Sequence, residues 1–132
     1  MIMNKMMVCC LFQTNGSKPS ILEIGVGTGN NLSSLPADCN LYCLEPNLEC
    51  QHYVAKALER HPGVHLSKFV RGFAEDMREF EDNMFDAVIC TFTMCSIRRP
   101  EKALSEIKRV LKPVSLLKNI TKKIVVLVGL AK

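Results

Sequence analysis

The middle of the chain consists of short apolar runs separated by polar and amphipathic stretches. Four of these runs have the length of β-strands, and they cover Ser20 to Ile24, Leu41 to Glu45, Val64 to Val70 and Phe85 to Phe92. The last run is dense in apolar and β-branched residues, which is typical of a strand buried on both faces of a sheet. We therefore expect strands separated by other elements, with the fourth strand enclosed on both sides.

Two of the intervening stretches carry apolar residues at helical spacing. One runs from Asn47 to His61, before Pro62 and Gly63, and the other opens at Pro100 and closes at Pro113. Their apolar stripes are Cys50, Val54, Ala57 and Leu58 in the first, and Ala103, Leu104, Ile107, Val110 and Leu111 in the second. This alternation predicts an α/β fold with a Rossmann-like, doubly wound and mostly parallel sheet that has helices on both faces.

A fifth apolar run, Ile124 to Ala131, lies near the end of the chain behind Lys122 and Lys123. Its length and β-branched content favour a buried strand, and shallow contact with a membrane surface is the alternative. If this run did not supply a strand, the parallel sheet would have an unpaired edge and would tend to associate.

Composition narrows the class of protein. The chain has 132 residues, of which 48% are hydrophobic, which is enough for the core of one globular domain. The net charge of +4 is spread along the chain without a dense basic stripe, and there is no tryptophan, so we expect no nucleic-acid partner.

The seven cysteines form no C-x-x-C pair, and the three histidines lack the spacing of metal ligands, so we expect no metal site. We expect the thiols to be reduced and to pack in the core of an intracellular protein. The N-terminal apolar run, Met6 to Phe12, is too short to span a membrane.

Three of the seven glycines, Gly25, Gly27 and Gly29, directly follow the first expected strand. Such clustering indicates a backbone that bends sharply or approaches something closely. The loop lacks the G-K-[ST] ending of a phosphate-binding loop, and its third glycine comes one position too early for the G-x-G-x-x-G fingerprint. The pattern is E-x-G-x-G-x-G from Glu23, and a carboxylate there would repel a pyrophosphate and attract an ammonium group. S-adenosylmethionine has such an amino-acid end.

Glu45 ends the second expected strand, twenty positions after Gly25. A carboxylate in that place can accept hydrogen bonds from the two hydroxyls of a ribose. Together with the glycine loop it predicts a ligand that contains adenosine. Both features follow strands, so they should meet at the carboxyl edge of the sheet.

The segment GFAEDM, Gly72 to Met77, follows the third expected strand. Backbone groups of Phe73 and Ala74, with Glu75 or Asp76 nearby, could form the slot that an adenine ring needs. The alternative is an acidic helix start that is stabilised by the helix dipole. For the Phe73 ring we expect a place in the core rather than the role of a stacking partner for the adenine.

The E-x-G-x-G-x-G loop, the acidic strand end, AED, FDAVICTFTMCSI and EIKRVLKP occur in the order found in class I S-adenosylmethionine-dependent methyltransferases. Over residues 20 to 113 the chain most resembles the methyltransferase-like seven branch, the thiol S-methyltransferases, with its segments LLEVGCGTG, VVVCT and VLCSV. The resemblance implies that the methionine moiety is surrounded by Glu23, Gly25, Gly27 and Gly29. It further implies that Glu45 holds the ribose, that Ala74 and Glu75 flank the adenine, and that Thr91 borders the methyl group.

The chain departs from this family after Pro113, where Val114 and Ser115 replace the glycine pair that leads into the next strand. The family also continues with further strands and substrate-binding segments, and it usually begins with a hydrophobic anchor. We therefore expect three parts in the chain: a leader (1–19), a cofactor-binding core (20–113) and a divergent tail (114–132). The C-terminal strands of the family would then be missing or replaced. The tail is the candidate source of a fifth strand.

The resemblance implies a methyltransferase that uses S-adenosylmethionine and acts on a small molecule, with a thiol as one candidate. The alternative is a truncated module that binds the cofactor without turnover, and a nicotinamide-dependent oxidoreductase is disfavoured by Asn30 and Glu23. No Ser-His-Asp or Cys-His pattern assigns a catalytic residue. We expect structural or solvated roles for His52, His61 and His65, and packing for Cys95.

We expect a cytoplasmic protein without a transmembrane span. Peripheral membrane association stays open, and the family resemblance points to the endoplasmic reticulum or lipid droplets. The sequence assigns neither the methyl acceptor nor the oligomeric state.

Overall fold

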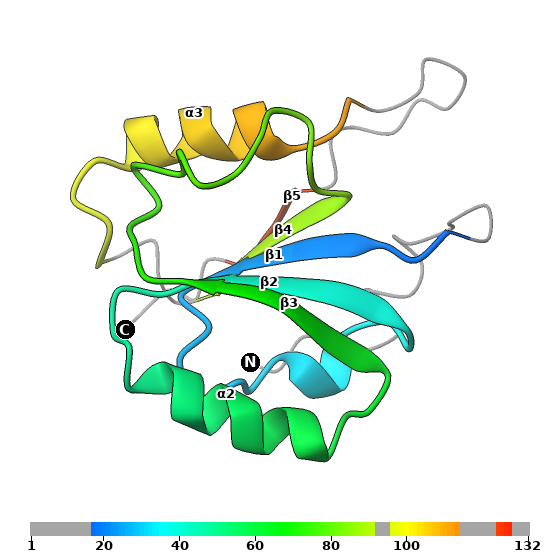
Figure 1. The fold of residues 1–132 in the computed structure, drawn as a ribbon. Helices are drawn as coiled ribbons and strands as arrows, with labels where there is room; N and C mark the ends of the chain where they lie inside the picture. Colours follow the sequence, from blue (N-terminus) through cyan, green and yellow to red (C-terminus); the bar gives the residue numbers. More distant parts are fainter. Residues whose placement is uncertain (1–16, 92–95, 114–123, 128–132) are drawn as a thin grey trace.

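The computed structural model describes residues 17–91 and 96–113 and the backbone of residues 124–127. Within these residues the elements are five strands, two α-helices and a short 3-10 helix after the first strand, and β4 follows β3 without a helix between them (Figure 1). In chain order the elements are β1 (Ser20–Ile24), η1 (Leu32–Ser34), β2 (Cys39–Leu44), α2 (Cys50–Glu59), β3 (Val64–Val70), β4 (Ala87–Thr91), α3 (Pro100–Val110) and β5 (Ile124–Leu127).

All strand pairs in the sheet are parallel, and the spatial order is β3-β2-β1-β4-β5. The chain moves outward from β1 through β2 to β3 and then returns to place β4 on the other side of β1. The strand order therefore reverses between β1 and β4, and ligands of open α/β sheets bind outside the carboxyl ends of the strands at such a reversal. This confirms the predicted Rossmann-like α/β fold.

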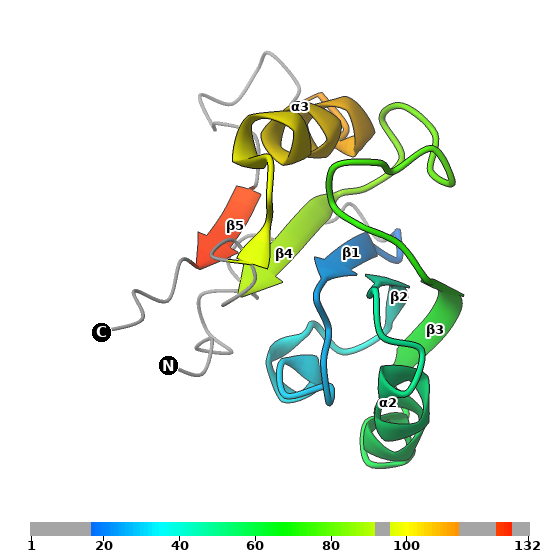
Figure 2. The same cartoon turned by 90° about the vertical axis from the view of Figure 1, so that its left-hand side faces the viewer.

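The sheet has a helical layer on each face, with α3 on one side and α2 on the other (Figures 1 and 2). Alternate residues of each central strand point to opposite faces, so β1 contributes to two cores. Ile21 packs with Val54 and Ala57 beneath α2, whereas Leu22 packs with Ile107 and other apolar side chains beneath α3. Every residue of β4 is buried, as its sequence predicted.

Two of the predicted strands, β1 and β3, have the predicted bounds. β2 begins two residues earlier and ends one residue earlier than predicted, and β4 begins two residues later. Both helices are shorter than the predicted stretches, Asn47 to His61 and Pro100 to Pro113. Leu104, which we expected in the buried stripe of α3, is 37% exposed because Ala103, Ile107 and Val110 already fill the side that faces the sheet. η1 was not predicted, since a single helical turn carries no periodic signal.

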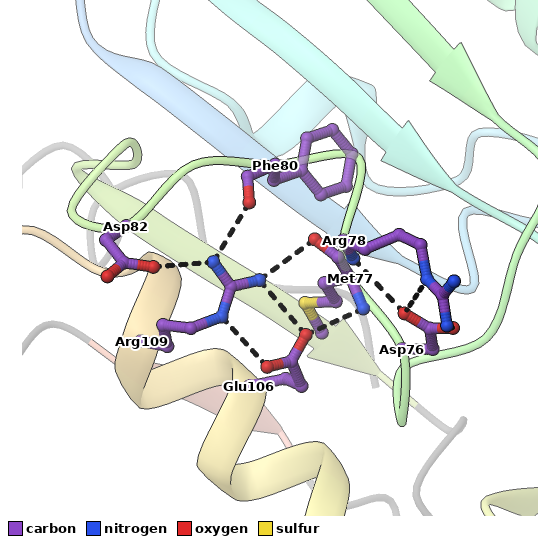
Figure 3. A network of polar contacts seen from close by, with 7 residues as sticks. All are labelled: Asp76, Met77, Arg78, Phe80, Asp82, Glu106 and Arg109. Atoms are coloured by element: carbon purple, nitrogen blue, oxygen red, sulfur yellow. Dashed lines mark hydrogen bonds and ion pairs between the residues drawn. The ribbon is translucent and has the colours of Figure 1, made fainter.

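Helix α3 also holds the segment that follows β3 (Figure 3). The Arg109 guanidinium donates to the carbonyl oxygens of Met77 (2.9 Å) and Phe80 (3.0 Å) and to the carboxylate of Asp82 (2.8 Å). Glu106 accepts from the Met77 amide at 2.7 Å and pairs with Arg109 at 2.9 Å. These bonds to backbone groups fix the residues from Met77 to Asp82 against α3.

Strand β5 covers the open edge of β4. Ile124–Leu127 pairs in parallel with Val88 to Thr91, so its removal would leave the backbone groups of a buried strand unpaired. We expect a chain without residues 124–132 to melt at least about 5 °C lower and to associate. Calorimetry and light scattering test this, with truncation after Leu127 as the control that keeps β5. A monodisperse variant with an unchanged melting temperature would contradict the prediction.

Candidate functional site

The glycine loop turns sharply as it leaves β1. Gly25, Gly27 and Gly29 all have positive φ, at 68°, 55° and 83°, a region that other residues adopt only at a cost. A Cβ on Gly27 would meet nothing within 4 Å, whereas one on Gly29 would lie 3.1 Å from the Cβ of Ala57 and 3.2 Å from Leu32. Gly29 therefore lets the loop pack against α2, and Gly27 faces open space.

Glu45 links the ends of β1 and β2. Its side chain is buried, and one carboxylate oxygen accepts a hydrogen bond from the Gly27 amide at 3.2 Å while the other accepts from the Asn47 amide at 3.1 Å. Gly25 is fixed to the same strand end, because its amide donates to the carbonyl of Leu44 at 2.8 Å. The two features that the sequence singled out are thus in direct contact. The carboxylate keeps further lone pairs that can accept from a ligand.

Glu23 lies in a buried polar cluster behind the loop. The Asn31 side-chain amide donates to Glu23 Oε1 and to Thr91 Oγ1, each at 2.8 Å, and so joins the ends of β1 and β4. Glu23 is 1% exposed, and its Oε2 accepts no hydrogen bond within the part of the chain that the structure describes. Burial raises the pKa of this carboxyl from 4.5 to about 7, although the bond from Asn31 lowers it.

Sequence reasoning missed Asn31. Composition and hydrophobic periodicity do not distinguish a buried asparagine from an exposed one, so neither indicates which of Asn30 and Asn31 is buried. The signal that could have found it is its spacing. An amide placed shortly after an acidic strand end can turn back to that carboxylate, as Asn31 does to Glu23.

A cleft of about 440 Å³ opens at the carboxyl edge of the sheet, on the side of α3. Its walls are the residues after β3 and the residues before α3, and its floor includes Ile24, Gly25 and Leu44. Glu75 joins the two walls, because its Oε1 accepts from the amides of Arg98 (3.0 Å) and Arg99 (3.3 Å). Ala74 is buried at the base of the same wall.

The predicted site residues therefore fall into two groups, with Gly29 apart from both. Gly25, Ala74 and Glu75 line the cleft, and the backbone of Gly27 is bonded to the Glu45 carboxylate beside it. Glu23 and Thr91 lie together around Asn31, and Gly29 packs between the loop and α2. All of them lie at or beside the carboxyl ends of β1 to β4, as the topology requires.

The sequence-based expectation for Phe73 was wrong. We expected its ring in the core, but the side chain is 65% exposed and lines the cleft. Its place in the core is taken by Ala74 and Met77, which are both buried.

The other chemically interesting side chains of the described residues do not gather at this edge. His65 and Asp38 lie within 3.5 Å of each other at the far side of the sheet, beside the start of β3. Burial raises the pKa of the Cys39 thiol to about 11 and that of Cys43 further, so neither is a thiolate near neutral pH. Over residues 17–91 and 96–113, no group of histidines, cysteines and acids could hold a metal ion. Cys95 lies outside the described residues.

A model of the methyltransferase domain family matches residues 22–117. The chain belongs to this family. This methyltransferase domain is 38% identical over 96 residues to human thiol S-methyltransferase TMT1B, a match that covers 73% of the chain and 39% of the human protein. It is 33% identical over 102 residues to human thiol S-methyltransferase TMT1A, covering 77% of the chain and 42% of that protein. The chain thus spans about two fifths of the length of these relatives.

The fold of this methyltransferase domain recurs in solved structures. The crystal structure of a SAM-dependent methyltransferase from Aquifex aeolicus matches with a TM-score of 0.63 at 20% identity, over 83% of this chain and 58% of that one. At 20% identity, this match shows a shared fold and nothing beyond it. Within the described part of the methyltransferase domain, no helix has the length and apolar content needed to cross a bilayer.

The buried carboxyl of Glu23 makes the stability of the domain depend on pH. Its pKa is higher in the folded chain, about 7, than the ordinary 4.5, so the folded state binds the proton more tightly. Stability should therefore fall as pH rises from about 4.5 to 7. A Glu23→Gln variant lacks this loss, and we expect its stability advantage over wild type to grow by about 2 to 3 kcal/mol between pH 5 and pH 8.

Urea unfolding of both proteins at the two pH values measures this difference. Both proteins contain the same other acids, such as Glu106, whose pKa is lowered by its bond to Arg109. The contribution of these acids to the pH dependence of stability therefore cancels in the comparison. An advantage of Glu23→Gln that is the same at pH 5 and pH 8 would show that Glu23 titrates normally.

Proposed function

We propose that the protein is an S-adenosylmethionine-dependent methyltransferase that transfers a methyl group to a small molecule, with thiols as the acceptor class. The observation that carries this proposal is the 3.2 Å hydrogen bond from the Gly27 amide to the Glu45 carboxylate. This bond joins the glycine turn to Glu45, the acid that we propose for the ribose. Both lie near the point where the strand order reverses. The match to the methyltransferase domain family supports the reaction type, and the names of the relatives support thiols.

The described residues fit this cofactor in three respects. Glu45 is held by two backbone amides and keeps lone pairs for the ribose hydroxyls. Gly27 leaves room for close approach to the loop. Glu23 offers a buried oxygen without a hydrogen-bond partner in the described chain, and an anionic oxygen is what a ligand ammonium group would favour.

In the proposed site, Glu23, Gly25, Gly27 and Gly29 surround the methionine moiety, Glu45 holds the ribose, Ala74 and Glu75 flank the adenine, and Thr91 borders the methyl group. When bound, the cofactor would supply a methyl group that is already activated by its bond to a sulfonium sulfur. As the acceptor sulfur bonds to the methyl carbon, the bond from that carbon to the sulfonium sulfur would break, and the rest of the cofactor would leave as a neutral thioether. The residues of the chain then have to align the acceptor and exclude water. A thiol acceptor must first lose its proton.

Incubation of the purified protein with methyl-labelled S-adenosylmethionine and a panel of alkyl thiols tests this function. We expect labelled thioether to form and S-adenosylhomocysteine to accumulate in equal amount. Calorimetric titration with S-adenosylhomocysteine should show binding near a 1:1 ratio. Absence of both binding and transfer would overturn the proposal.

A second candidate function is a module that binds S-adenosylmethionine without turnover. The observation that favours it is the departure from the family pattern after Pro113, where Val114 and Ser115 stand in place of the glycine pair. The same pair of experiments separates the candidates, because this one predicts binding of S-adenosylhomocysteine and no labelled product from any acceptor.

We also propose residues 20–113 as the cofactor-binding core, with 1–19 as a leader and 114–132 as a tail. For the location, we propose the cytoplasm, with peripheral association at the surface of the endoplasmic reticulum or lipid droplets, on the basis of the family resemblance. Fractionation of cells that express the tagged chain tests this. Full recovery in the soluble fraction would exclude the membrane association.

A further inference from the structure

Phe73 stands out because a large apolar side chain is left 65% exposed on a wall of the cleft. Full burial of a phenylalanine is worth about 1.5–3 kcal/mol, and the same region buries two others. Phe80 and Phe85 are almost fully buried and meet edge-to-face at 5.2 Å, with Tyr42 against Phe85 at the same distance. The core therefore accepts aromatic rings from this segment but leaves Phe73 outside it.

The backbone around Phe73 explains its exposure. Ahead of it, Gly72 is packed so closely on Leu44 that an added Cβ would lie 3.0 Å from a Leu44 methyl carbon. After it, the Asp76 amide donates to the Phe73 carbonyl at 3.0 Å and closes a turn. Ala74 and Met77 point into the core, so the side chain between Gly72 and Ala74 is directed outward.

This turn is anchored rather than loose. Met77, directly after the turn, is bonded through its amide to Glu106 and through its carbonyl to Arg109, both on α3 (Figure 3). Glu75 is bonded to the amides of Arg98 and Arg99 on the opposite wall of the cleft. Phe73 is thus a ring presented on a fixed wall.

The rest of the cleft suits a flat, largely apolar group. Its lining includes the aliphatic side chains of Ile24, Leu44 and Ile97, and its volume of about 440 Å³ is in the range of small-molecule sites. The acidic residues Glu75 and Asp76 also line the cleft. A purine ring has an apolar face that can pack against the aliphatic side chains. The amino group on its edge can donate to a carboxylate.

We propose that Phe73 stacks on the base of the bound nucleoside, and so recognises the face of the ring. This inference rests on the proposed function, because it takes the ligand to be S-adenosylmethionine or its demethylated product. It assigns to Phe73 a binding role within that site. Stacking of a base on an aromatic side chain contributes enough to change affinity by about tenfold or more.

Titration with S-adenosylhomocysteine compares wild type with Phe73→Ala, Phe73→Leu and Phe73→Tyr. We expect about tenfold weaker binding for Phe73→Ala, an intermediate loss for Phe73→Leu, which keeps apolar volume without a ring, and affinity within about twofold for Phe73→Tyr. Tyr53→Ala is the matched control, because Tyr53 is 51% exposed on α2 and does not line the cleft. It should bind as wild type does.

A second titration uses 5′-methylthioadenosine, which keeps the base and lacks the amino-acid end. Phe73→Ala should weaken it by the same factor as S-adenosylhomocysteine. Wild-type affinity of Phe73→Ala or of Phe73→Leu would overturn the stacking role, as would a loss confined to S-adenosylhomocysteine. A changed KM for the acceptor with unchanged cofactor affinity would assign Phe73 to the acceptor instead.

The failure of the inference and that of the proposed function are distinguishable. If wild type binds neither ligand, the proposed function falls and the inference with it. If wild type binds both and Phe73→Ala binds equally well, only the inference falls. Melting temperatures of the variants should stay near that of wild type, because the exposed ring contributes little to the core.

Discussion

Glu45→Ala should abolish measurable binding of S-adenosylhomocysteine, with affinity at least about 100-fold weaker than wild type. The change removes the acceptor of the proposed ribose hydroxyls, and hydrogen bonds to a charged group contribute about 1.5–3 kcal/mol each. It also releases the Gly27 and Asn47 amides, which the carboxylate now holds at 3.2 Å and 3.1 Å. Calorimetric titration measures the loss.

Two variants make the Glu45 result specific. Glu59→Ala removes an exposed carboxylate at the end of α2 and should leave affinity unchanged. Glu45→Gln keeps one acceptor oxygen and should lose less than Glu45→Ala. Binding by Glu45→Ala within about threefold of wild type would place the sugar elsewhere.

Gly27→Arg should also eliminate binding, but for a steric reason. A Cβ at this position meets nothing within 4 Å, so the long side chain would extend into the space that the proposed ligand needs. The positive φ of 55° adds strain of about 1–2 kcal/mol. We expect a folded variant with affinity reduced by about 100-fold or more, measured by the same titration and by a thermal melt.

Alanine variants separate the steric effect of a long side chain from the backbone strain of a positive φ. Gly27→Ala carries the backbone strain without the long side chain and should keep most of the affinity. Gly29→Ala should mainly destabilise the fold, because its Cβ would lie 3.1 Å from Ala57 at a φ of 83°. Equal binding by Gly27→Arg and wild type would show that the ligand does not approach the loop.

The architecture was predictable because the strands are buried and the helices are amphipathic. Ser20–Ile24 and Val64–Val70 were located to the residue, and chain order alone placed the glycine loop and Glu45 at one edge. What periodicity cannot supply is the direction of individual side chains. Asn31 was missed because its role depends on a turn that brings it back to Glu23 and across to Thr91.

Phe73 shows the opposite error. A phenylalanine near a strand end is usually part of the core, and composition gave no reason to expect otherwise. Its exposure follows from the packing of Gly72 on Leu44 and from the anchoring of Met77 to α3, which are tertiary contacts between residues distant in the sequence. Local reasoning therefore fails most readily where a loop is shaped by another element.

The bond between Glu75 and the amides of Arg98 and Arg99 ties together two loops that leave different strands. Both arginines are exposed to solvent, so without this carboxylate their amide hydrogens would exchange rapidly with deuterated water. Slow exchange at these two positions would then report that the loops stay joined, and faster exchange that they separate. Hydrogen exchange at the amides of Arg98 and Arg99 would thus measure how often the bonds to Glu75 open.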